Sequence, residues 1–337
     1  MFTNLDLKKT FKNFNRQKIL IIGDVMIDSY LWGKVKRISP EAPVPVVSEV
    51  FQEKRLGGAA NVALNIKAMG AVPILCSVIG DDERGQEFLE LLGEENLSDF
   101  GIFMDKKRVT TRKTRVISGT QHLLRVDEEI DAPLTISMEN KLIEFVTTLL
   151  KEKTIDSVIF QDYDKGVAGK RGIKEILKVA NEMKIPVLVD PKKRNFMVYE
   201  KATLFKPNFK ELTTGLKMDI DKNDLEQIAG VMQEFRKMKS HGMILLTLSE
   251  MGVMINEGDE YHHIAAEIRD IADVSGAGDT VISLAALCVG EKLNPLDIAA
   301  LSNLAGGQVC EKAGVVSVNK EQLLLEATQI QKEEMEG

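Results

Sequence analysis

Residues 273–286 have the sequence DVSGAGDTVISLAA, in which a glycine-rich segment runs directly into an apolar stretch. The two glycines let the backbone approach a bound group closely. The apolar stretch predicts a buried helix whose free N–H groups and positive dipole end face that group. This arrangement is typical of an anion-binding site, and we expect the rest of the chain to be organised around it.

Asp279 falls in the first turn of the predicted helix, where its carboxylate could contact a hydroxyl just beyond the bound anion. An acid at this position is also favoured by the helix dipole alone, so Asp279 taken by itself favours the structural interpretation, and the other motifs of the chain lower its weight. Phosphoryl transfer from a nucleotide to an alcohol requires an anion site and a base together, and the segment offers both.

The overall composition is that of a globular protein. The 337 residues are 44% hydrophobic and 28% charged, with a net charge of −7, and suit one large α/β domain or two ordinary ones. The negative charge argues against a nucleic acid partner, and no stretch is long and apolar enough to span a membrane. Cys76, Cys288 and Cys310 lie in apolar surroundings without a Cys-x-x-Cys motif, which predicts buried thiols and, with no apolar leader, a cytoplasmic location.

Strands and helices alternate along most of the chain. Residues 18–24 form a short apolar run closed by Gly23 and Asp24, which is typical of a buried parallel strand ending at the ligand edge of a sheet. From residue 137 onward the alternation is regular. We therefore predict a doubly wound, mostly parallel sheet flanked by helices, in a single domain over residues 1–337.

Two segments, near 27–55 and 108–127, break this alternation. The first predicts short strands at 30–33 and 44–50 around a proline-rich segment, and the second predicts strands at 111–118 and 121–126. We expect the two segments to pair into a small β lid over the carboxyl edge of the main sheet. Exposed strands of such a lid are natural pairing edges, so a homodimer through the lid strands is expected.

Three motifs then occur in a definite order. Gly57-Gly58-Ala59-Ala60-Asn61 opens a predicted helix, Asn208-x-x-Glu211 follows in mid-chain, and the segment 273–279 comes last. Neither a dinucleotide-binding fingerprint nor a P-loop is present, so any nucleotide must bind in another way. This set of motifs resembles the ribokinase-like, or PfkB-type, carbohydrate kinases over nearly the whole chain.

A closer resemblance is carried by residues 23–28, 37–47 and 57–63, with similar segments at 190–192, 206–208 and 246–252. They resemble the kinase part of the heptose 7-phosphate kinase/adenylyltransferase proteins of ADP-heptose and lipopolysaccharide core synthesis. The resemblance implies transfer of the ATP γ-phosphate to the anomeric hydroxyl of D-glycero-β-D-manno-heptose 7-phosphate. No His-x-Gly-His nucleotidyltransferase motif occurs, so adenylyl transfer is expected to belong to another protein. Val315 stands where the pattern has Thr, a departure that bears on nucleotide and monovalent-cation contacts.

The resemblance also implies roles for individual residues. Asp279 would be the base, and the amides of Gly276, Ala277 and Gly278 would stabilise charge on the transferring phosphoryl group. Asn208 and Glu211 would order Mg²⁺ on ATP, although the same pair predicts a helix cap. ATP and Mg²⁺ are thus the expected cofactors, with a monovalent cation as a third candidate.

The remaining candidates surround these groups. For the sugar, Asp28 ranks first, followed by Asp24, Gly57, Gly58, Asn61 and Asp162. For the 7-phosphate, the candidates are basic residues that can bind phosphate: Lys165, Arg112, Arg125, Lys192 and Arg194. For the nucleotide, they are Asn208, Lys192, Thr247, Ser249, Gly252, Gly278 and Asn303.

Two other functions remain open from the sequence. One is a kinase of the same fold that acts on another sugar, sugar phosphate or nucleoside. The other is a non-catalytic nucleotide- or sugar-binding module. Asp279 together with Gly276 and Gly278 disfavours the module, and residues 37–47 favour heptose.

Overall fold

The computed structural model describes residues 1–337 except Thr3, Thr120, Lys153 and Gly337. Within these residues a main sheet has the strand order β13-β12-β11-β10-β9-β8-β1-β4-β5. Neighbouring strands are parallel from β5 to β11, whereas β12 and β13 pair antiparallel. The strands are β1 (Lys18–Gly23), β4 (Val72–Gly80), β5 (Gly101–Asp105), β8 (Ser157–Gln161), β9 (Val187–Asp190), β10 (Leu204–Phe205), β11 (Met243–Thr247), β12 (Val253–Glu257) and β13 (Glu260–Ile264). The predicted doubly wound, mostly parallel sheet is confirmed.

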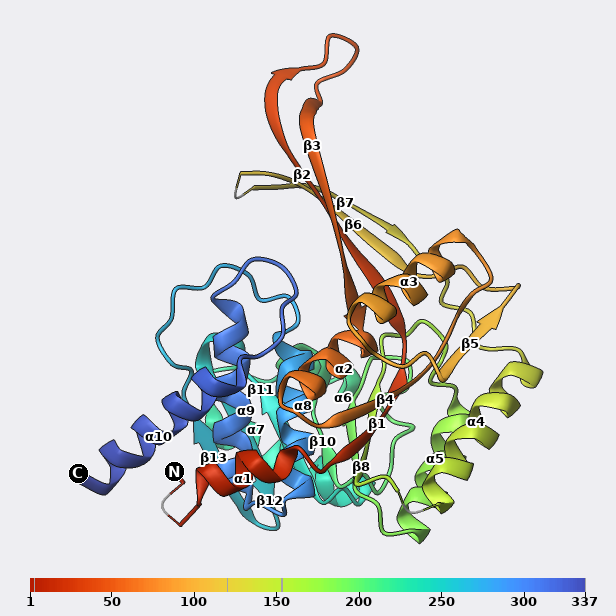
Figure 1. The fold of residues 1–337 in the computed structure, drawn as a ribbon. Helices are drawn as coiled ribbons and strands as arrows, with labels where there is room; N and C mark the ends of the chain where they lie inside the picture. The colour runs from red at the N-terminus through yellow and green to blue at the C-terminus, as the bar shows by residue number, and fades with distance from the viewer. Residues whose placement is uncertain (3, 120, 153, 337) are drawn as a thin grey trace.

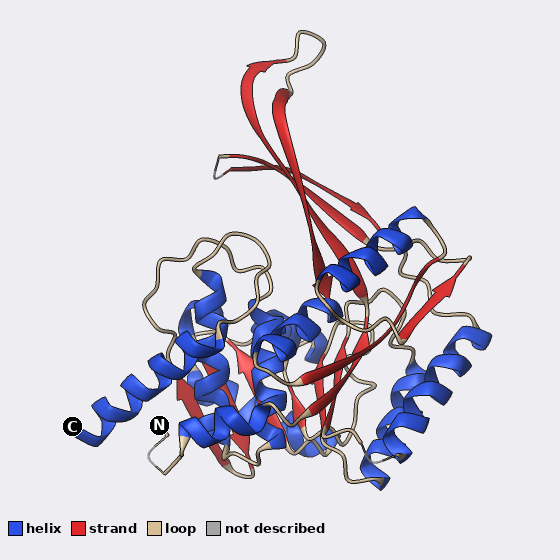
Figure 2. Ribbon diagram, in the orientation of Figure 1, coloured by secondary structure: helices blue, strands red, loops and turns tan. Residues whose placement is uncertain are grey.

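Helices cover both faces of the main sheet (Figure 2). Along β1, Ile19 and Ile21 pack into one core cluster and Leu20 into the other, because successive side chains of a strand point to opposite faces. One face packs against α1 (Leu7–Phe14), α2 (Ala59–Ala68), α3 (Glu83–Glu94), α8 (Ala277–Gly290), α9 (Pro295–Cys310) and α10 (Lys320–Glu336). The other packs against α4 (Ile136–Lys151), α5 (Lys170–Glu182), α6 (Phe209–Leu216) and α7 (Leu225–Lys239).

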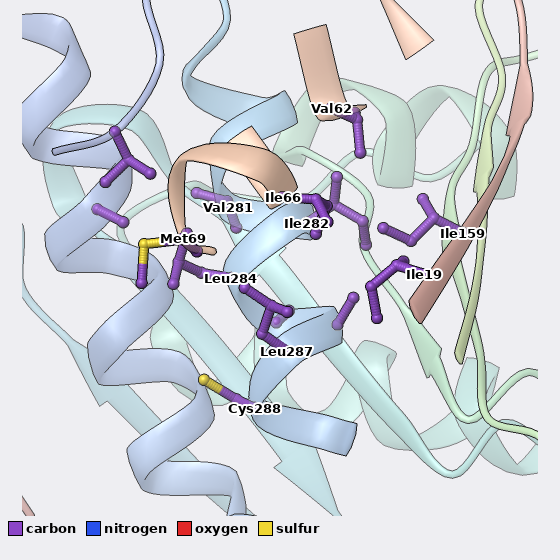
Figure 3. Packing of buried hydrophobic residues seen from close by; sticks show 14 of the residues in the cluster. Ile19, Val62, Ile66, Met69, Ile159, Val281, Ile282, Leu284, Leu287 and Cys288 are labelled. Carbon is purple, nitrogen blue, oxygen red and sulfur yellow. The ribbon is translucent and has the colours of Figure 1, made fainter. Parts of the chain in front are cut away.

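Helix α8 lies inside the protein, as its apolar sequence predicts. Every residue from Asp279 to Val289 is buried. Figure 3 shows its side chains between α2 and the sheet: Val281, Ile282, Leu284 and Leu287 lie near Val62, Ile66, Ile19 and Ile159. The three cysteines are buried and free, as predicted. None of the helices in the described ranges combines the length and apolar character needed to cross a membrane.

A second, four-stranded sheet, here called the lid sheet, has the order β3-β2-β6-β7. Its strands are β2 (Val25–Ile38), β3 (Pro45–Gly58), β6 (Arg112–Ser118) and β7 (Gln121–Glu128). The two predicted lid segments pair where β2 lies parallel to β6. Thr120, which the second predicted segment includes, lies outside the described residues.

The prediction of short strands in the first lid segment is wrong. Strands β2 and β3 each contain 14 residues and form a long hairpin that projects from the body (Figure 1), rather than two short strands. Pro40 and Pro43 are confined to its turn, and Pro45 begins β3, where a missing N–H is tolerated. Gly57 and Gly58 end β3, and Gly58 is also the N-cap of α2, so the helix predicted to open at this motif is confirmed. Gly58 has φ +61°, and a Cβ there would lie 2.4 Å from the carbonyl oxygen of Asp24.

Two helices were not predicted from the sequence. Residues 7–14 belong to a segment that looks like a polar leader, yet Leu7, Phe11 and Phe14 fall on one helical face and are buried. Helix α7, residues 225–239, buries Ile228, Met232 and other apolar residues in the same way. Both helices depend on tertiary packing, because their remaining residues are mostly charged.

Candidate active site

The site centres on the start of α8. Gly276 caps this helix with φ +84°, a conformation that a glycine adopts without strain. A Cβ at Gly276 would also lie 2.8 Å from the Nδ2 of Asn61, so the two segments meet closely. The glycine-rich segment 273–279 and the first turn of α2 are therefore neighbours, although more than 200 residues separate them in sequence.

The carboxylate of Asp279 is buried, with 4% of the residue exposed, and accepts three hydrogen bonds. Asn61 Nδ2 donates to Oδ2 at 2.8 Å. Gln161 Nε2 at 3.0 Å and the Tyr163 hydroxyl at 2.6 Å both donate to Oδ1. Burial raises the pKa of Asp279 to about 6, even though Asn61 and Tyr163 act to lower it. A carboxyl group with this pKa can accept a proton near neutral pH.

A second polar group lies under the same helix start. Lys206 Nζ contacts Asp190 Oδ2 at 2.9 Å, and both side chains are almost fully buried. Gln161 Nε2 also reaches Asp190 Oδ2, at 3.2 Å. A Cβ at Gly278 would lie 3.6 Å from Lys206 Nζ, which places this cation beside the N-terminal amides of α8.

Gln161, Tyr163, Asp190 and Lys206 were not among the site residues predicted from the sequence. A usable signal was present, because Gln161 ends β8 and Asp190 ends β9. Ligands of such sheets bind at the carboxyl ends of the strands. Neither the contact with Asp279 nor the pairing with Lys206 could be read from the sequence, since both depend on side-chain directions.

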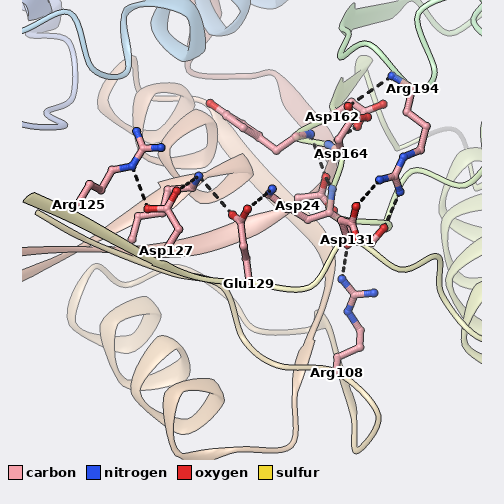
Figure 4. A network of polar contacts seen from close by, with 12 residues as sticks. Asp24, Arg108, Arg125, Asp127, Glu129, Asp131, Asp162, Asp164 and Arg194 are labelled. Atoms are coloured by element: carbon pink, nitrogen blue, oxygen red, sulfur yellow. Dashed lines mark hydrogen bonds and ion pairs between the residues drawn. The ribbon is translucent and has the colours of Figure 1, made fainter.

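Asp24 and Asp162, two of the sugar candidates, are bound by the protein itself. Asp24 accepts hydrogen bonds from the backbone N–H groups of Tyr163 (2.9 Å), Lys165 (3.1 Å) and Val167 (3.0 Å). Asp162 accepts from Asn195 and Tyr199 side chains and from the N–H of Asp164. Figure 4 shows both carboxylates inside this network. They hold residues 162–167 in place.

Asp28 lies at the base of the lid sheet and is 3% exposed. It forms an ion pair with Arg115 of β6, a residue not among the sequence candidates. A Cβ at Gly57 would come within 2.0 Å of Asp28 Oδ2, so glycine is required where β3 passes this carboxylate. Asp28 and Gly57 are thus in direct contact, next to Gly58 and the start of α2.

The five phosphate candidates are each paired with a carboxylate. Arg125 is the most exposed of them and lies on β7 (Figure 4), whereas Lys165 is mostly buried and pairs with Glu129, the residue after β7. The pairs are Lys165 with Glu129, Arg112 with Glu128, Arg125 with Asp127, Lys192 with Glu211 and Arg194 with Asp131. Four of these carboxylates belong to residues 127–131, at the end of β7 and just after it, so four of the cations lie along one segment, whereas Lys192 pairs with Glu211 of α6.

Asn208 and Glu211 form a capping box at the start of α6. The N–H of Glu211 donates to Asn208 Oδ1 at 2.8 Å, and the N–H of Asn208 donates to Glu211 Oε2 at 2.9 Å. This confirms the helix-cap interpretation of the pair. The other carboxylate oxygen of Glu211 pairs with Lys192, and Asn208 forms a β-bridge with Thr247.

The other nucleotide candidates gather near the end of β13. Ser249 begins a short 3₁₀ helix with φ +57°, and Gly252 follows with φ +85°. A Cβ at Gly252 would lie 2.0 Å from the carbonyl oxygen of Ile264. Asn303 of α9 donates to the carbonyl of Ala265 at 2.8 Å, so these residues line one region.

The doubly wound sheet, the lid sheet and the buried carboxylate at a glycine-capped helix start together define an α/β small-molecule kinase. Residues 16–322 match the family described as pfkB family carbohydrate kinase. The chain belongs to this family and is an ATP-dependent carbohydrate kinase.

Similar curated proteins are named bifunctional protein HldE. The one from Helicobacter pylori (strain P12) is 38% identical over 309 residues, which cover 92% of this chain and 66% of that protein. The one from Pelobacter propionicus is 40% identical over 319 residues, covering 93% and 64%. The chain thus spans slightly less than two thirds of the length of these relatives.

Solved structures share the fold at low identity. Phosphofructokinase-2 from Escherichia coli in complex with potassium superposes with a TM-score of 0.75 at 17% identity, covering 93% of this chain and 99% of that chain. Arabidopsis thaliana ribokinase complexed with ribose and ATP gives a TM-score of 0.70 at 14% identity, covering 91% and 98%. These structures establish the ribokinase-like fold.

Proposed function

We propose that the protein transfers the γ-phosphate of ATP to the anomeric hydroxyl of D-glycero-β-D-manno-heptose 7-phosphate, giving the 1,7-bisphosphate. The observation that carries this proposal is the hydrogen bond between Asn61 and Asp279. It joins the motif expected to bind the sugar to the helix start expected to bind the phosphoryl group. The similarity of residues 23–28 and 37–47 to heptose 7-phosphate kinases, and the HldE relatives, support the choice of heptose.

In the proposed reaction the sugar hydroxyl oxygen forms a bond to the γ-phosphorus, the bond from that phosphorus to the bridging oxygen breaks, and ADP leaves. Asp279 accepts the hydroxyl proton. The N–H groups of Gly276, Ala277 and Gly278 stabilise the charge on the transferring group, and the ammonium of Lys206 beside Gly278 adds to it. Positioning and electrostatics thus supply most of the rate.

The Asn208 and Glu211 pair fits Mg²⁺ bound to a nucleotide. Both side chains offer oxygen atoms as metal ligands. The described residues contain no group of three or more His, Cys, Asp or Glu able to hold a metal by themselves. Mg²⁺ in kinases takes one or two carboxylates and completes its shell with phosphates and water. When bound, the ion would neutralise charge on the phosphates, with Glu211 exchanging its contact with Lys192 for the metal shell.

The sugar is proposed to lie between Asp28, Gly57, Gly58 and Asn61, on the side of Asp279 that faces the lid sheet. Its 7-phosphate would then recruit basic residues at the base of that sheet, with Lys165 and Arg112 better placed than the exposed Arg125. Asp24 and Asp162 support this region by fixing residues 162–167. Lys192, Thr247, Ser249, Gly252 and Asn303 are proposed to serve the nucleotide.

The lid sheet is also proposed to pair two copies of the chain. Strands β3 and β7 are its edges, and Val50 and Phe51 on β3 and Leu124 on β7 are more than half exposed. Exposed apolar strands of this kind are natural pairing surfaces. We therefore expect a homodimer in which the projecting hairpins of two copies meet.

The dimer is tested by sedimentation of Phe51→Glu, which should lower the dimer fraction at least about tenfold by burying a charge at the interface. The matched control is Ile268→Glu, because Ile268 is fully exposed but lies outside the lid sheet. Equal dimer fractions in both variants and the wild type would contradict pairing through the lid.

The substrate is tested with a panel of sugars, sugar phosphates and nucleosides assayed for ADP release, followed by NMR assignment of the phosphorylated position. Phosphorylation of heptose 7-phosphate at the anomeric oxygen, with the highest kcat/KM of the panel, is the expected outcome. Turnover of fructose 6-phosphate or a nucleoside alone would instead assign another kinase specificity. ATP binding with no turnover of any acceptor would indicate a binding module.

A further inference from the structure

The two oxygens of the Asp279 carboxylate are held differently. Oδ1 accepts from both Gln161 (3.0 Å) and the Tyr163 hydroxyl (2.6 Å). Among the described residues, only Asn61 donates to Oδ2, at 2.8 Å. Because each carboxylate oxygen offers about two lone-pair sites, Oδ1 is fully used and Oδ2 keeps one site free.

We propose that Tyr163 is a positioning residue that saturates Oδ1 and thereby makes Oδ2 the atom that takes the proton from the sugar hydroxyl. This inference rests on the proposed role of Asp279 as the base. Its geometric basis is the unequal set of donors: two donors bind Oδ1 and one binds Oδ2, and Gln161 and Asn61 are buried whereas Tyr163 is half-buried.

Two contacts hold Tyr163 in addition to its bond to Asp279. Its backbone N–H donates to Asp24 Oδ2 at 2.9 Å, which anchors the residue to the end of β1. The ammonium of Lys192 lies 5.4 Å from the ring centroid, within the range of a cation–π contact. Burial and the nearby charge of Asp279 raise the pKa of the phenol well above its usual value. The hydroxyl therefore stays protonated and donates to the carboxylate.

The charged groups around Asp279 set the direction of the expected pH effect. Burial is the main cause that raises its pKa, and Asp190 of β9 adds to it. Donation from Asn61 and Tyr163 lowers it, as does the cation of Lys206. Lys192 is the other cation whose charge interacts with this carboxylate. Loss of the Tyr163 hydroxyl removes a donor to the ionised form, so the pKa of Asp279 should rise further.

The test is the pH dependence of kcat/KM for Tyr163→Phe, measured with ATP and heptose 7-phosphate or whichever acceptor of the panel is turned over. Because the base must be ionised, a higher pKa moves the acid limb of the profile to higher pH. We expect a shift of about one pH unit and a fall in kcat of about 10- to 100-fold, with KM for ATP unchanged.

Tyr199→Phe is the matched control. Its hydroxyl donates to Asp162 Oδ2 at 3.1 Å, so the variant loses the same kind of bond on a neighbouring buried carboxylate that does not touch Asp279. The acid limb of this control should not move. Thermal unfolding of both variants shows whether either change acts through stability.

The outcomes separate this inference from the proposed function. If the acid limb of the kcat/KM profile of Tyr163→Phe lies at the same pH as that of the wild type, the positioning role is overturned, whether or not kcat falls. An equal shift in Tyr199→Phe overturns it as well, because the effect would then not pass through Asp279. Wild-type turnover in Asp279→Asn would instead overturn the base assignment on which the inference rests.

Discussion

Three buried carboxylates lie in different surroundings. Asp24 follows β1, Asp162 follows β8, and Asp279 lies in the first turn of α8. Asp24 and Asp162 are each 1% exposed and Asp279 is 4% exposed. Among the described residues, the carboxylate of Asp24 accepts only from backbone N–H groups of one loop, whereas that of Asp279 accepts only from side chains of two separate segments. Burial alone therefore does not mark a catalytic carboxylate.

The type of donor explains the difference in proposed roles. Three backbone donors tie Asp24 to the path of residues 163–167, so its charge stabilises one loop conformation. Side-chain donors from α2 and from the end of β8 leave the backbone at Asp279 free to form the first turn of α8. That turn presents its amides and its carboxylate toward the same space.

The strongest test of this contrast is Asp279→Asn. We expect kcat to fall by about 10³- to 10⁴-fold while the Kd for ATP stays within about twofold, because the amide keeps the shape but cannot accept the proton. Steady-state kinetics and calorimetric titration with ATP measure the two quantities. A parallel loss of ATP binding would mean that Asp279 acts through the fold of the site.

Asp24→Ala tests the other side of the comparison. Three N–H groups, one buried and two partly buried, would lose their acceptor, so the free energy of unfolding should fall by about 2–4 kcal/mol. Denaturant titration measures this change. If Asp24 instead binds the sugar, stability would hold and KM for the acceptor would rise by more than about tenfold, an outcome that would reverse the roles assigned here.

The smallest expected effect concerns the pH profile. Burial raises the pKa values of both Asp162 and Asp279 to about 6. A base with this pKa is ionised above pH 6, so kcat/KM should fall as the pH drops through about 6. Asp162→Asn should leave this acid limb in place if Asp279 is responsible. If the acid limb disappears in Asp162→Asn, then Asp162 rather than Asp279 is the group that sets it.

Much of the fold follows from local patterns in the sequence. The apolar run of β1, the alternation of strands and helices after residue 137 and the helix α8 were predicted because strands and helices leave periodic apolar signals. The full length of β2 and β3 and helix α1 were missed. Their stability comes from neighbouring strands and helices, which a local pattern does not contain.

For the site, the sequence by itself determined the chemical groups and the order of the motifs. It placed Asp279 behind Gly276 and Gly278, and Asn61 behind Gly57 and Gly58, because glycine and small polar residues are typical of tight turns and helix starts. The tertiary structure alone decided what surrounds Asp279. Tyr163 and Gln161 reach its carboxylate because the crossing of α2, α8 and the end of β8 brings side chains together over distances of more than 100 residues, and no local rule fixes such directions.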